Sequence, residues 1–514
     1  MQKYLLYILL FLSATANAQV PEDVLRYSYL PQNGTARSLA IGGAMASLGG
    51  DVSSIYINPA GLGNYKTGEF IFSPAFMLNK NNIEYRDTKN TNTKNNFNIG
   101  TIGLVAGGKD AYNTTRSNAF AIAFTQTASY NNILQYKGLN NYSSISEQWV
   151  EDAANSGLTV PQILNNPNYA FGTAPALYTF LVDTFRSNGA LIIKSLPEFL
   201  LDKGQALQQQ KTIATSGGMY ELALGYASNY NDKLLIGGSL GIPILNYKNT
   251  TTLMESDTSN IANNNFANFT YTDAYTTKGA GVNLKFGIIY RPVEHIRLGV
   301  AVHTPSYFFS LTDKRSTTLT ANTENYNGIA TATNTLFTNN QPNESKYSLL
   351  TPWRFLISGS YVLREIEDVT KQKGFITADI EYVKYGSSGF NSIAENPDAT
   401  ETAYYKNLNK VIKSEYKGAF NFKLGGELKF NTIMARLGAA YYTNPYKDAA
   451  LKANRLLLSG GIGYRHKGYF IDLTYVHSFN KDVDVTYRLQ DKANTFATIN
   501  NQRGNIALSF GIKF

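Results

Sequence analysis

Residues 36–62 read ARSLAIGGAMASLGGDVSSIYINPAGL, and strand-like sequence follows them to the end of the chain. Their small side chains let backbones approach closely, and their glycines can adopt the positive φ angles that other residues avoid. Asn58-Pro59-Ala60-Gly61 is typical of a turn, because the residue before Pro is disfavoured in the α region and Gly permits a reversal. The stretch therefore predicts a compact appendage to a sheet. It would begin with a helix over residues 35–48, which Thr35 caps and Gly49-Gly50 ends.

The first residues are typical of a secretory signal peptide. Lys3 supplies the positive charge, residues 4–12 form a short apolar core, and Ala16-Asn17-Ala18 fits the A-x-A pattern before a cleavage site. No apolar run in the chain approaches the roughly 20 residues that a membrane-spanning helix needs. We therefore expect residues 1–18 to be a signal peptide and Gln19 to be the first mature residue. A membrane-spanning part would have to be a closed barrel, because lipid leaves no backbone group without a partner.

From Gly68 onward the hydrophobic pattern has a period of two. Many segments alternate apolar with small or polar residues over about ten positions, a length that suits one tilted strand of an outer-membrane barrel. An even number of strands is what a bacterial single-chain barrel needs. We predict about fourteen strands, which cover residues 68–77, 97–105, 118–128, 219–229, 233–247, 279–291, 295–311, 353–363, 374–385, 418–430, 432–443, 455–465, 468–478 and 504–514.

The connections between these segments alternate in length. The long ones cover residues 78–96, 129–218, 248–278, 312–352, 386–417, 444–454 and 479–503, and the short ones cover 106–117, 230–232, 292–294, 364–373, 431 and 466–467. Outer-membrane barrels have short periplasmic turns and long outer loops, whereas a soluble sandwich has no reason to keep this order. The alternation predicts a transmembrane barrel with both chain termini at its periplasmic end.

The two faces of the predicted strands differ in polarity. In segment 374–385, Ile376, Ile380 and Tyr382 alternate with Asp379 and Glu381. A charge on the lipid face near the midplane would cost about 2–4 kcal/mol, so we expect the charged residues to face the lumen.

Composition agrees with an exported barrel and excludes several other classes. Charged residues make up 16% of the 514 residues, and 36 Tyr and 28 Phe supply material for aromatic belts at two interfaces. The net charge of +9 comes without a basic run, which argues against a nucleic-acid partner. There is no Cys, so disulfides, thiol nucleophiles and thiolate metal sites are excluded.

A barrel of this size has a lumen wider than its own side chains can fill, so something must plug it. We expect residues 19–66 to form a small N-terminal hatch and residues 67–514 to form the barrel. An apolar hatch would leave an apolar pocket above it, suited to a ligand with a long alkyl or aromatic body, because each buried CH₂ contributes roughly 0.8 kcal/mol.

The small-residue segment Gly42-Gly43-Ala44, the bend Gly49-Gly50-Asp51 and the motif Asn58-Pro59-Ala60 resemble the hatch of the FadL/TodX family of outer-membrane proteins. Segment 281–306 is also similar to that family's mid-barrel hairpin. The resemblance implies passive, hatch-gated uptake of long-chain fatty acids or other hydrophobic compounds, in the outer membrane of a Gram-negative bacterium. It makes Asn58, Pro59, Ala60, Gly61 and Leu62 the hatch motif, and implies a monomer whose partners are a hydrophobic ligand and outer-membrane lipid, with no cofactor.

The family resemblance also implies an outer groove that captures the ligand and a sideways exit at a kinked third strand. Residues 176–185 (ALYTFLVDTF) are apolar enough to line such a groove. The third predicted strand, residues 118–128, contains no Gly or Pro, so the sequence itself gives no reason for a kink there. Lys285, Arg297 and Arg354 are candidate partners for a ligand carboxylate, although interior ion pairing is the simpler explanation for any one of them.

Two other classes of function stay open. A barrel enzyme acting on lipids would need a Ser, His and acid at one rim, or an acid pair such as Asp379 and Glu381. The four histidines, His295, His303, His466 and His477, lack metal-ligand spacing, and the acids fit an interior ion network with Arg354, Lys423, Glu427 and Arg436. A general porin or a surface protein without transport activity is the third class.

Overall fold

The computed structural model describes residues 21–28, 33–109, 116–341, 343–363, 373–449, 451 and 453–514. The expected signal peptide, residues 1–18, and Gln19 lie outside the described residues. None of the described helices is both long enough and apolar enough to cross a membrane.

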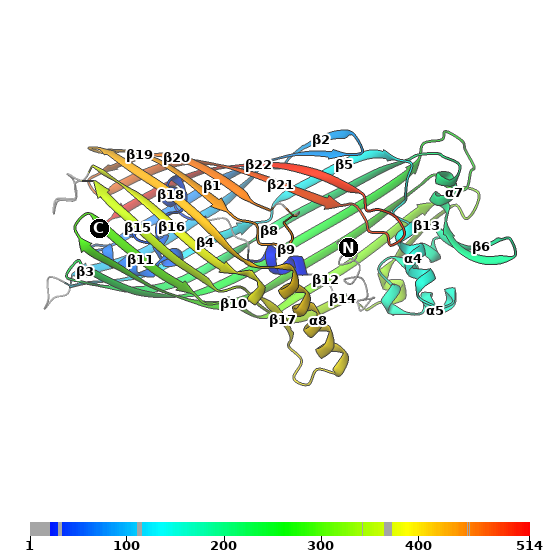
Figure 1. Cartoon of the computed structure of the whole chain (residues 1–514), viewed down its shortest axis with the longest axis horizontal. Helices are drawn as coiled ribbons and strands as arrows, with labels where there is room; N and C mark the ends of the chain where they lie inside the picture. Colours follow the sequence, from blue (N-terminus) through cyan, green and yellow to red (C-terminus); the bar gives the residue numbers. More distant parts are fainter. Residues whose placement is uncertain are drawn as a thin grey trace.

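Among the described residues, fourteen antiparallel strands close into a barrel (Figure 1). The wall strands, in order, are β1 (Glu69–Tyr85), β3 (Asn96–Lys109), β4 (Arg116–Ser129), β8 (Leu207–Tyr230), β9 (Leu234–Asp257), β10 (Asn268–Val293), β11 (Ile296–His303), β15 (Arg354–Leu363), β16 (Gly374–Lys384), β18 (Gly418–Phe430), β19 (Ile433–Tyr442), β20 (Arg455–His466), β21 (Tyr469–Val485) and β22 (Phe496–Lys513). The last strand pairs with the first, from Glu69 opposite Lys513 to Glu84 opposite Thr498. Each strand predicted from the alternating pattern overlaps one of these, so the barrel prediction is confirmed.

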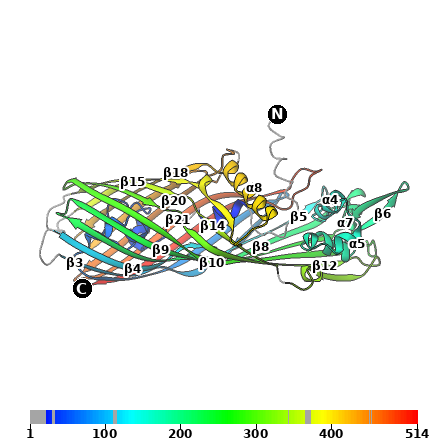
Figure 2. The same ribbon diagram turned by 90° about the horizontal axis from the view of Figure 1, so that it is seen from below.

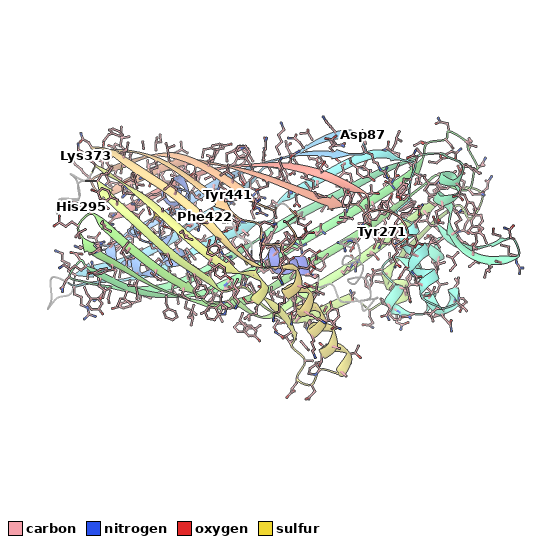
Figure 3. All side chains as sticks on the ribbon, viewed as in Figure 1. Asp87, Tyr271, His295, Lys373, Phe422 and Tyr441 are labelled. Carbon is pink, nitrogen blue, oxygen red and sulfur yellow. The ribbon has the colours of Figure 1, made fainter. Side chains whose placement is uncertain are left out.

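Short turns gather at one end of the barrel and long connections at the other. Figure 3 shows His295 and Lys373 at the end with the short turns, and Asp87 and Tyr271 toward the opposite end. The turn between β8 and β9 places Asn231 and Asp232 at φ 54° and 52°. Asn and Asp tolerate this left-handed region, and it matches the twist of a tight hairpin. The predicted alternation of loop lengths is confirmed.

The outward face of the wall carries an apolar band. On β18 the outward positions run from Phe420 to Phe430, whose side chains are 49% and 62% exposed. Ten residues at about 3.3 Å each, tilted by roughly 40°, rise about 25 Å, the height of the apolar band of an outer-membrane barrel. The inward-facing positions of the wall strands hold buried charges, including Asp379 and Glu381 on β16 and Lys423 on β18. The faces are therefore arranged as the alternation predicted.

The strands on one side of the barrel are much longer than predicted. β8, β9 and β10 have 24, 24 and 26 residues and continue outward as a tall sheet (Figure 1). The sheet is extended by β2 (Thr88–Thr93), β5 (Asn132–Asn140), β12 (Tyr307–Asn322), β13 (Ile329–Thr333), β14 (Asn343–Leu350) and β17 (Gly389–Ser392). These outer parts carry polar residues on both faces, because water wets both sides, so the alternation that marks a strand in lipid is lost.

The outer end carries a small helical cap, which Figure 2 shows beside the outer parts of the long strands. It contains α4 (Glu147–Asn155), α5 (Val160–Leu164), η3 (Pro167–Tyr169), α6 (Thr173–Tyr178), α7 (Leu196–Asp202), η4 (Asn334–Phe337) and the hairpin of β6 (Val182–Ser187) and β7 (Ala190–Ser195). Ala176, Leu177, Leu181 and Val182 are buried in its core together with Trp149. Segment 176–185 therefore buries its aliphatic side chains in the cap core while Tyr178 and Phe180 are exposed, and its place in an outer groove stays a prediction.

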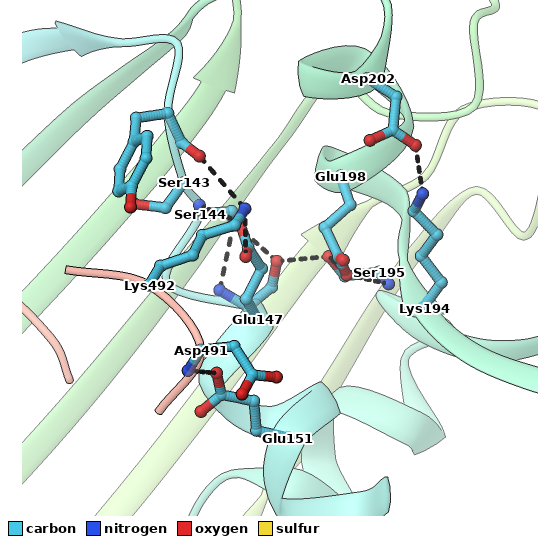
Figure 4. A network of polar contacts seen from close by, with 12 residues as sticks. Ser143, Ser144, Glu147, Glu151, Lys194, Ser195, Glu198, Asp202, Asp491 and Lys492 are labelled. Atoms are coloured by element: carbon cyan, nitrogen blue, oxygen red, sulfur yellow. Dashed lines mark hydrogen bonds and ion pairs between the residues drawn. The ribbon is translucent and has the colours of Figure 1, made fainter. Parts of the chain in front are cut away.

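Polar contacts join the cap helices to one another and to the connection between β21 and β22 (Figure 4). Glu147 accepts the backbone N–H of Ser144 at 2.8 Å and pairs with Lys492 at 2.6 Å. Glu255, on the outer part of β9, accepts the N–H of Ile145 at 2.8 Å and the side-chain amide of Gln209 at 2.6 Å. Burial raises the pKa of the Glu255 carboxyl to about 7.

The N-terminal part of the described chain lies inside and beside the barrel. It forms α1 (Pro21–Arg26), α2 (Ala36–Ala40), α3 (Ser54–Ile57) and η2 (Pro59–Asn64). The Pro21 carbonyl accepts a hydrogen bond from Tyr416 at 3.2 Å, directly after α8 (Ala399–Glu415), which follows η6 (Tyr385–Ser387) and β17 on the outer side. The expected periplasmic N-terminus is thus wrong for α1, because residues 21–28 extend from the hatch toward the outer side.

Candidate functional site

Residues 33–66, called the plug below, lie in the bore at the level of the apolar band. Asp379 on β16 accepts the backbone N–H groups of Met45 and Ala46 at 3.0 and 3.1 Å. Ser509 on β22 accepts the N–H of Ala36 at 2.8 Å. Further contacts join Thr474 Oγ1 to Ala36 O (2.7 Å), Ser459 Oγ to Ala40 O (3.0 Å), Ser47 Oγ to Ser358 Oγ (2.6 Å) and Ser239 Oγ to Ile55 O (2.8 Å). The wall side chains therefore hold the plug largely by its backbone.

The Asn58-Pro59-Ala60 motif joins the plug to itself and to the wall. The Asn58 side-chain amide donates to Ala46 O at 2.6 Å, and lies 3.3 and 3.4 Å from the carbonyls of Ile288 and Val300 on β10 and β11. Its oxygen accepts the N–H of Ala60 at 3.2 Å, which caps η2 at the position where Pro59 begins the helix. Leu62 is fully buried, and a Cβ on Gly61 would meet Gly49 Cα at 2.7 Å.

The small-residue segment differs from the predicted helix. Thr35 caps α2 as predicted, but the helix ends after Ala40 rather than near residue 48. Gly42 and Gly43 have φ angles of 66° and 74°, in the left-handed region that ends a helix. The next residue, Ala44, is fully buried. The segment therefore turns within the bore and does not continue as three helical turns.

Glycines of the wall make room for the plug, a feature that sequence analysis missed. A Cβ on Gly237 of β9 would lie 2.6 Å from the backbone nitrogen of Ala60, and one on Gly225 of β8 would lie 2.8 Å from Ile55 Cγ1. Side chains at these positions would displace the plug. Other wall glycines whose Cβ would meet plug atoms are Gly100, Gly103, Gly107, Gly287, Gly299, Gly425, Gly438 and Gly461. The available signal was a glycine at an inward position on many neighbouring strands.

A cavity of about 140 Å³ lies on the outer side of the plug. Ile57 of the plug forms part of its lining, and Met219, Phe308 and Leu356 contribute apolar surface. Charged residues of the wall also line it, namely Glu221, Lys285, Arg354, Glu381 and Lys423. The expectation of an apolar pocket directly above the hatch is therefore wrong. This cavity can hold the polar end of an amphipathic molecule better than a hydrocarbon.

The three candidate partners for a ligand carboxylate fall into two places. Lys285 and Arg354 line the cavity, where Lys285 pairs with Glu221 and Arg354 pairs with Glu381 at 3.1 Å. Arg297 lies at a second, smaller cavity, and its guanidinium donates to Leu48 O of the plug at 3.1 Å. The structure thus brings two of the three together, each already in an ion pair.

An aromatic chamber lies beyond the cavity. Tyr130, Tyr247 and Tyr275 surround the end of α1, with the Tyr130 and Tyr247 rings 5.2 Å apart and those of Tyr247 and Tyr275 6.2 Å apart. The Arg26 guanidinium lies 4.8 Å from the Tyr247 ring centroid, a cation–π geometry. Val24, Tyr27, Phe308 and Leu311 belong to the same buried cluster. The apolar volume above the plug is therefore occupied by the chain's own α1.

Solved structures with the same architecture include a FadL homologue from Pseudomonas aeruginosa. Its TM-score is 0.55 at 12% identity, over 95% of this chain and 100% of that one. The toluene transporter TodX of P. putida has a TM-score of 0.51 at 12% identity, over 94% and 99%. The chain has the FadL/TodX fold. No family model matches the sequence, and no curated protein does. The resemblance stated from the plug motif is confirmed at the level of fold.

In this FadL/TodX fold the third wall strand, β4, is irregular. Its pairing with β3 stops at Thr101 opposite Thr125, although both strands continue, and its register with β8 shifts between Gln126 and Ala128. Asn33 of the plug donates to the carbonyl of Gln126 at 2.5 Å. Thr125 and Asn33 also line the cavity, so the unpaired strand edges lie next to it. A bulge needs neither Gly nor Pro, so no residue type in residues 118–128 marks it.

Two histidines of the FadL/TodX-like barrel have structural partners. His303 is buried, and its Nε2 lies 2.9 Å from the carbonyl of Ile57 in the plug. His477 is on the outside of β21, 2.9 Å from the hydroxyl of Tyr475. Of the acids, Asp379 binds the plug and Glu381 pairs with Arg354 and Lys423. Among the described residues no group of His, Asp and Glu side chains could hold a metal ion.

Proposed function

We propose that the chain is an outer-membrane protein for plug-gated uptake of small hydrophobic compounds, with long-chain fatty acids as the first candidate. The observation that carries the proposal is the plug itself, which fills the bore at the level of the apolar band, below an aromatic chamber that α1 occupies. A bore closed in this way excludes free diffusion of polar solutes. The shared fold with a toluene transporter supports the class of ligand.

The proposed route runs from the aromatic chamber through the cavity to the unpaired edges of β3 and β4. A hydrophobic ligand would enter the chamber when α1 withdraws, because Val24 and Tyr27 now fill that volume. A sideways exit at Thr101 and Thr125 would deliver it into the apolar layer without passing the plug's hydrogen-bonded face. The plug would hold the route closed through Asn33, which binds the carbonyl of Gln126 on the open edge.

Lys285 and Arg354 are the proposed partners for an acidic head group. Both line the cavity beside apolar residues, so a carboxylate there could replace Glu221 or Glu381 as the counter-ion while an alkyl chain extends into the chamber. Replacing each by Gln would weaken binding of a fatty acid but leave binding of toluene unchanged. Equal effects on the two ligands would remove head-group recognition from the proposal.

A reversible cross-link tests gating, because the chain has no native cysteine. Ser47 of the plug and Ser358 of the wall have their hydroxyl oxygens 2.6 Å apart, so the double variant Ser47→Cys, Ser358→Cys can form a disulfide that fixes the plug. Uptake of labelled fatty acid by cells producing this variant should stop under oxidation and return with reductant. The two single variants are the matched controls. Unchanged uptake by the oxidised double variant would refute plug gating.

The charged lining of the cavity favours one alternative, a channel for small polar or amphipathic anions. The same cells test this alternative, because uptake of a short dicarboxylate in place of the fatty acid would identify such a channel. A protein that transports none of these compounds would belong to the class of surface proteins without transport activity.

A further inference from the structure

Lysines stand on the outside of the barrel just above its apolar band. On β9 the outward positions run from Ile236 through Leu240 and Ile244 to Lys248, so polarity changes within four residues. β10 changes in the same way, from Leu284 to Lys278. The members of this set, called the lysine collar, are Lys80, Lys248, Lys278, Lys314, Lys346, Lys384, Lys417 and Lys481, all of them exposed.

Strand register places four members side by side. Lys248 and Lys314 both lie opposite Thr276 of β10, one on each neighbouring strand. Lys278 and Lys346 both lie opposite Thr312 of β12. Paired strands are about 4.8 Å apart, so two lysines flanking one strand stand about 10 Å apart and can contact one divalent anion or two neighbouring ones.

The collar follows the edge of the lipid-facing surface on β16 and β18. Tyr382 and Phe420, whose rings are 5.0 Å apart, belong to an aromatic belt that includes Phe355 and Trp353. Lys384 lies two residues outward from Tyr382, and Lys417 lies three residues outward from Phe420. Aromatic belts mark the head-group level of a membrane, so the ammonium groups stand where lipid head groups begin.

Few acids compensate this charge at the same level. In the described chain Glu344 pairs with Lys314 at 3.0 Å and with Lys346 at 3.3 Å. The other six members form no ion pair with a described acidic side chain. The opposite edge of the band ends differently, in exposed aromatic residues such as Tyr290, Phe430, Tyr464 and Tyr469. Exposed lysines also stand at that end, among them Lys233, Lys373 and Lys467, so the collar is distinguished by the side-by-side placement of its members next to the apolar band.

We propose that the lysine collar binds the phosphate groups of lipids in the outer leaflet around the barrel. The position of the collar next to the apolar band favours a lipid over a soluble anion. The alkyl chains of a lipid can pack on Leu240, Leu284 and their neighbours while its phosphate group binds the lysines. Lysine suits this task as a point charge with three donors on a flexible stem. The proposal is independent of which compound the bore admits.

The test places the full chain in lipid discs and uses native mass spectrometry to compare the numbers of bound phosphatidic acid and phosphatidylcholine molecules. The head group of phosphatidic acid is a phosphate monoester. The variant carries Lys248→Gln, Lys278→Gln, Lys384→Gln and Lys417→Gln. A lysine at an anionic surface contributes roughly a fivefold gain in affinity, so four substitutions should weaken phosphatidic acid binding by about 100-fold or more. Raising the salt from 0.05 to 0.5 M should weaken wild-type binding as well.

The matched control replaces four exposed lysines away from the collar by Gln, namely Lys89, Lys137, Lys203 and Lys233. It should keep wild-type affinity, and a second variant with Arg at the four collar positions should keep most of it. Equal weakening in the control set, or no loss in the collar set while the barrel remains folded by circular dichroism, would overturn the proposal. Equal binding of phosphatidylcholine and phosphatidic acid by the wild type would also overturn it.

Discussion

Substitution Asn58→Asp should release the plug from its closed position. The two side chains have the same shape, and the carboxylate keeps the bond to the Ala60 N–H. The amide nitrogen, however, faces the carbonyls of Ala46, Ile288 and Val300 at 2.6, 3.3 and 3.4 Å. An oxygen in its place leaves those acceptors without a donor, at about 1–3 kcal/mol for the short bond alone, and adds an unpaired buried charge. We expect a loss of at least about 3 kcal/mol in plug docking, which is roughly a 100-fold rise in the displaced population.

Amide hydrogen exchange measures this population directly. Residues 42–62 should lose about 100-fold in protection in the variant, while residues 418–430 of β18 should exchange as in the wild type because the barrel is intact. Asn500→Asp, on the exposed outward face of β22, is the matched control and should change neither region. If Asn58→Asp leaves the exchange of residues 42–62 within twofold of the wild type, the reasoning from these three carbonyls is refuted.

Three other predictions concern the wall and the cap. Gly237→Val should displace the plug, because a Cβ at this position would lie 2.6 Å from the backbone nitrogen of Ala60 and overpacking costs typically about 1–3 kcal/mol. Amide hydrogen exchange of residues 59–64 should therefore become faster. An unchanged exchange rate would contradict the close contact. Arg436→Ala should lower the free energy of barrel unfolding by about 3–5 kcal/mol in urea titrations, because the buried Glu427 and Asp472 lose their short ion pairs of 2.6 and 2.5 Å. They keep only the longer contacts to Arg37 at 3.8 Å and Arg465 at 3.9 Å, and a loss under about 1 kcal/mol would argue against a strong pair. Because the pKa of Glu255 is raised from 4.5 to about 7, the folded cap binds more protons than the opened one between these values. The stability of the cap should therefore fall by at most about 3 kcal/mol as the pH rises from about 4.5 to 7, and should stay constant above pH 7. The rate of protease cleavage within residues 140–200 measures this stability. Glu255→Gln should abolish the pH dependence.

The fold was predictable because lipid imposes one rule on every strand. Outward residues such as Ile376 and Ile380 must be apolar and their neighbours Asp379 and Glu381 must avoid lipid, so alternation identifies each membrane-spanning segment. The rule ends where lipid ends. Outer parts of β8 to β10, wetted on both faces, read as loops in the sequence although they continue as strands.

The site was predictable only in part. The plug motif identified Asn58 and its turn, because Pro and Gly constrain the backbone locally. Its partners on the wall, such as Asp379 and Gly237, depend on strand register, which local sequence does not specify. The expectation of an apolar pocket above the plug was wrong because composition does not show which side chains lie at the same height in the bore. In the structure α1 fills the apolar chamber, and charged residues including Lys285 line the remaining cavity.

The hydrogen bond between Ala36 and Ser509 constrains the order in which the barrel can assemble. These two residues are 473 positions apart, near opposite ends of the chain. The plug, near the start of the chain, can therefore complete its contacts only after the last strand, β22, has formed. The plug must already be inside the lumen when β22 pairs with β1 and closes the barrel. During biogenesis the barrel thus closes around the plug. If the pairing of β22 with β1 is slowed, the plug should remain outside the lumen.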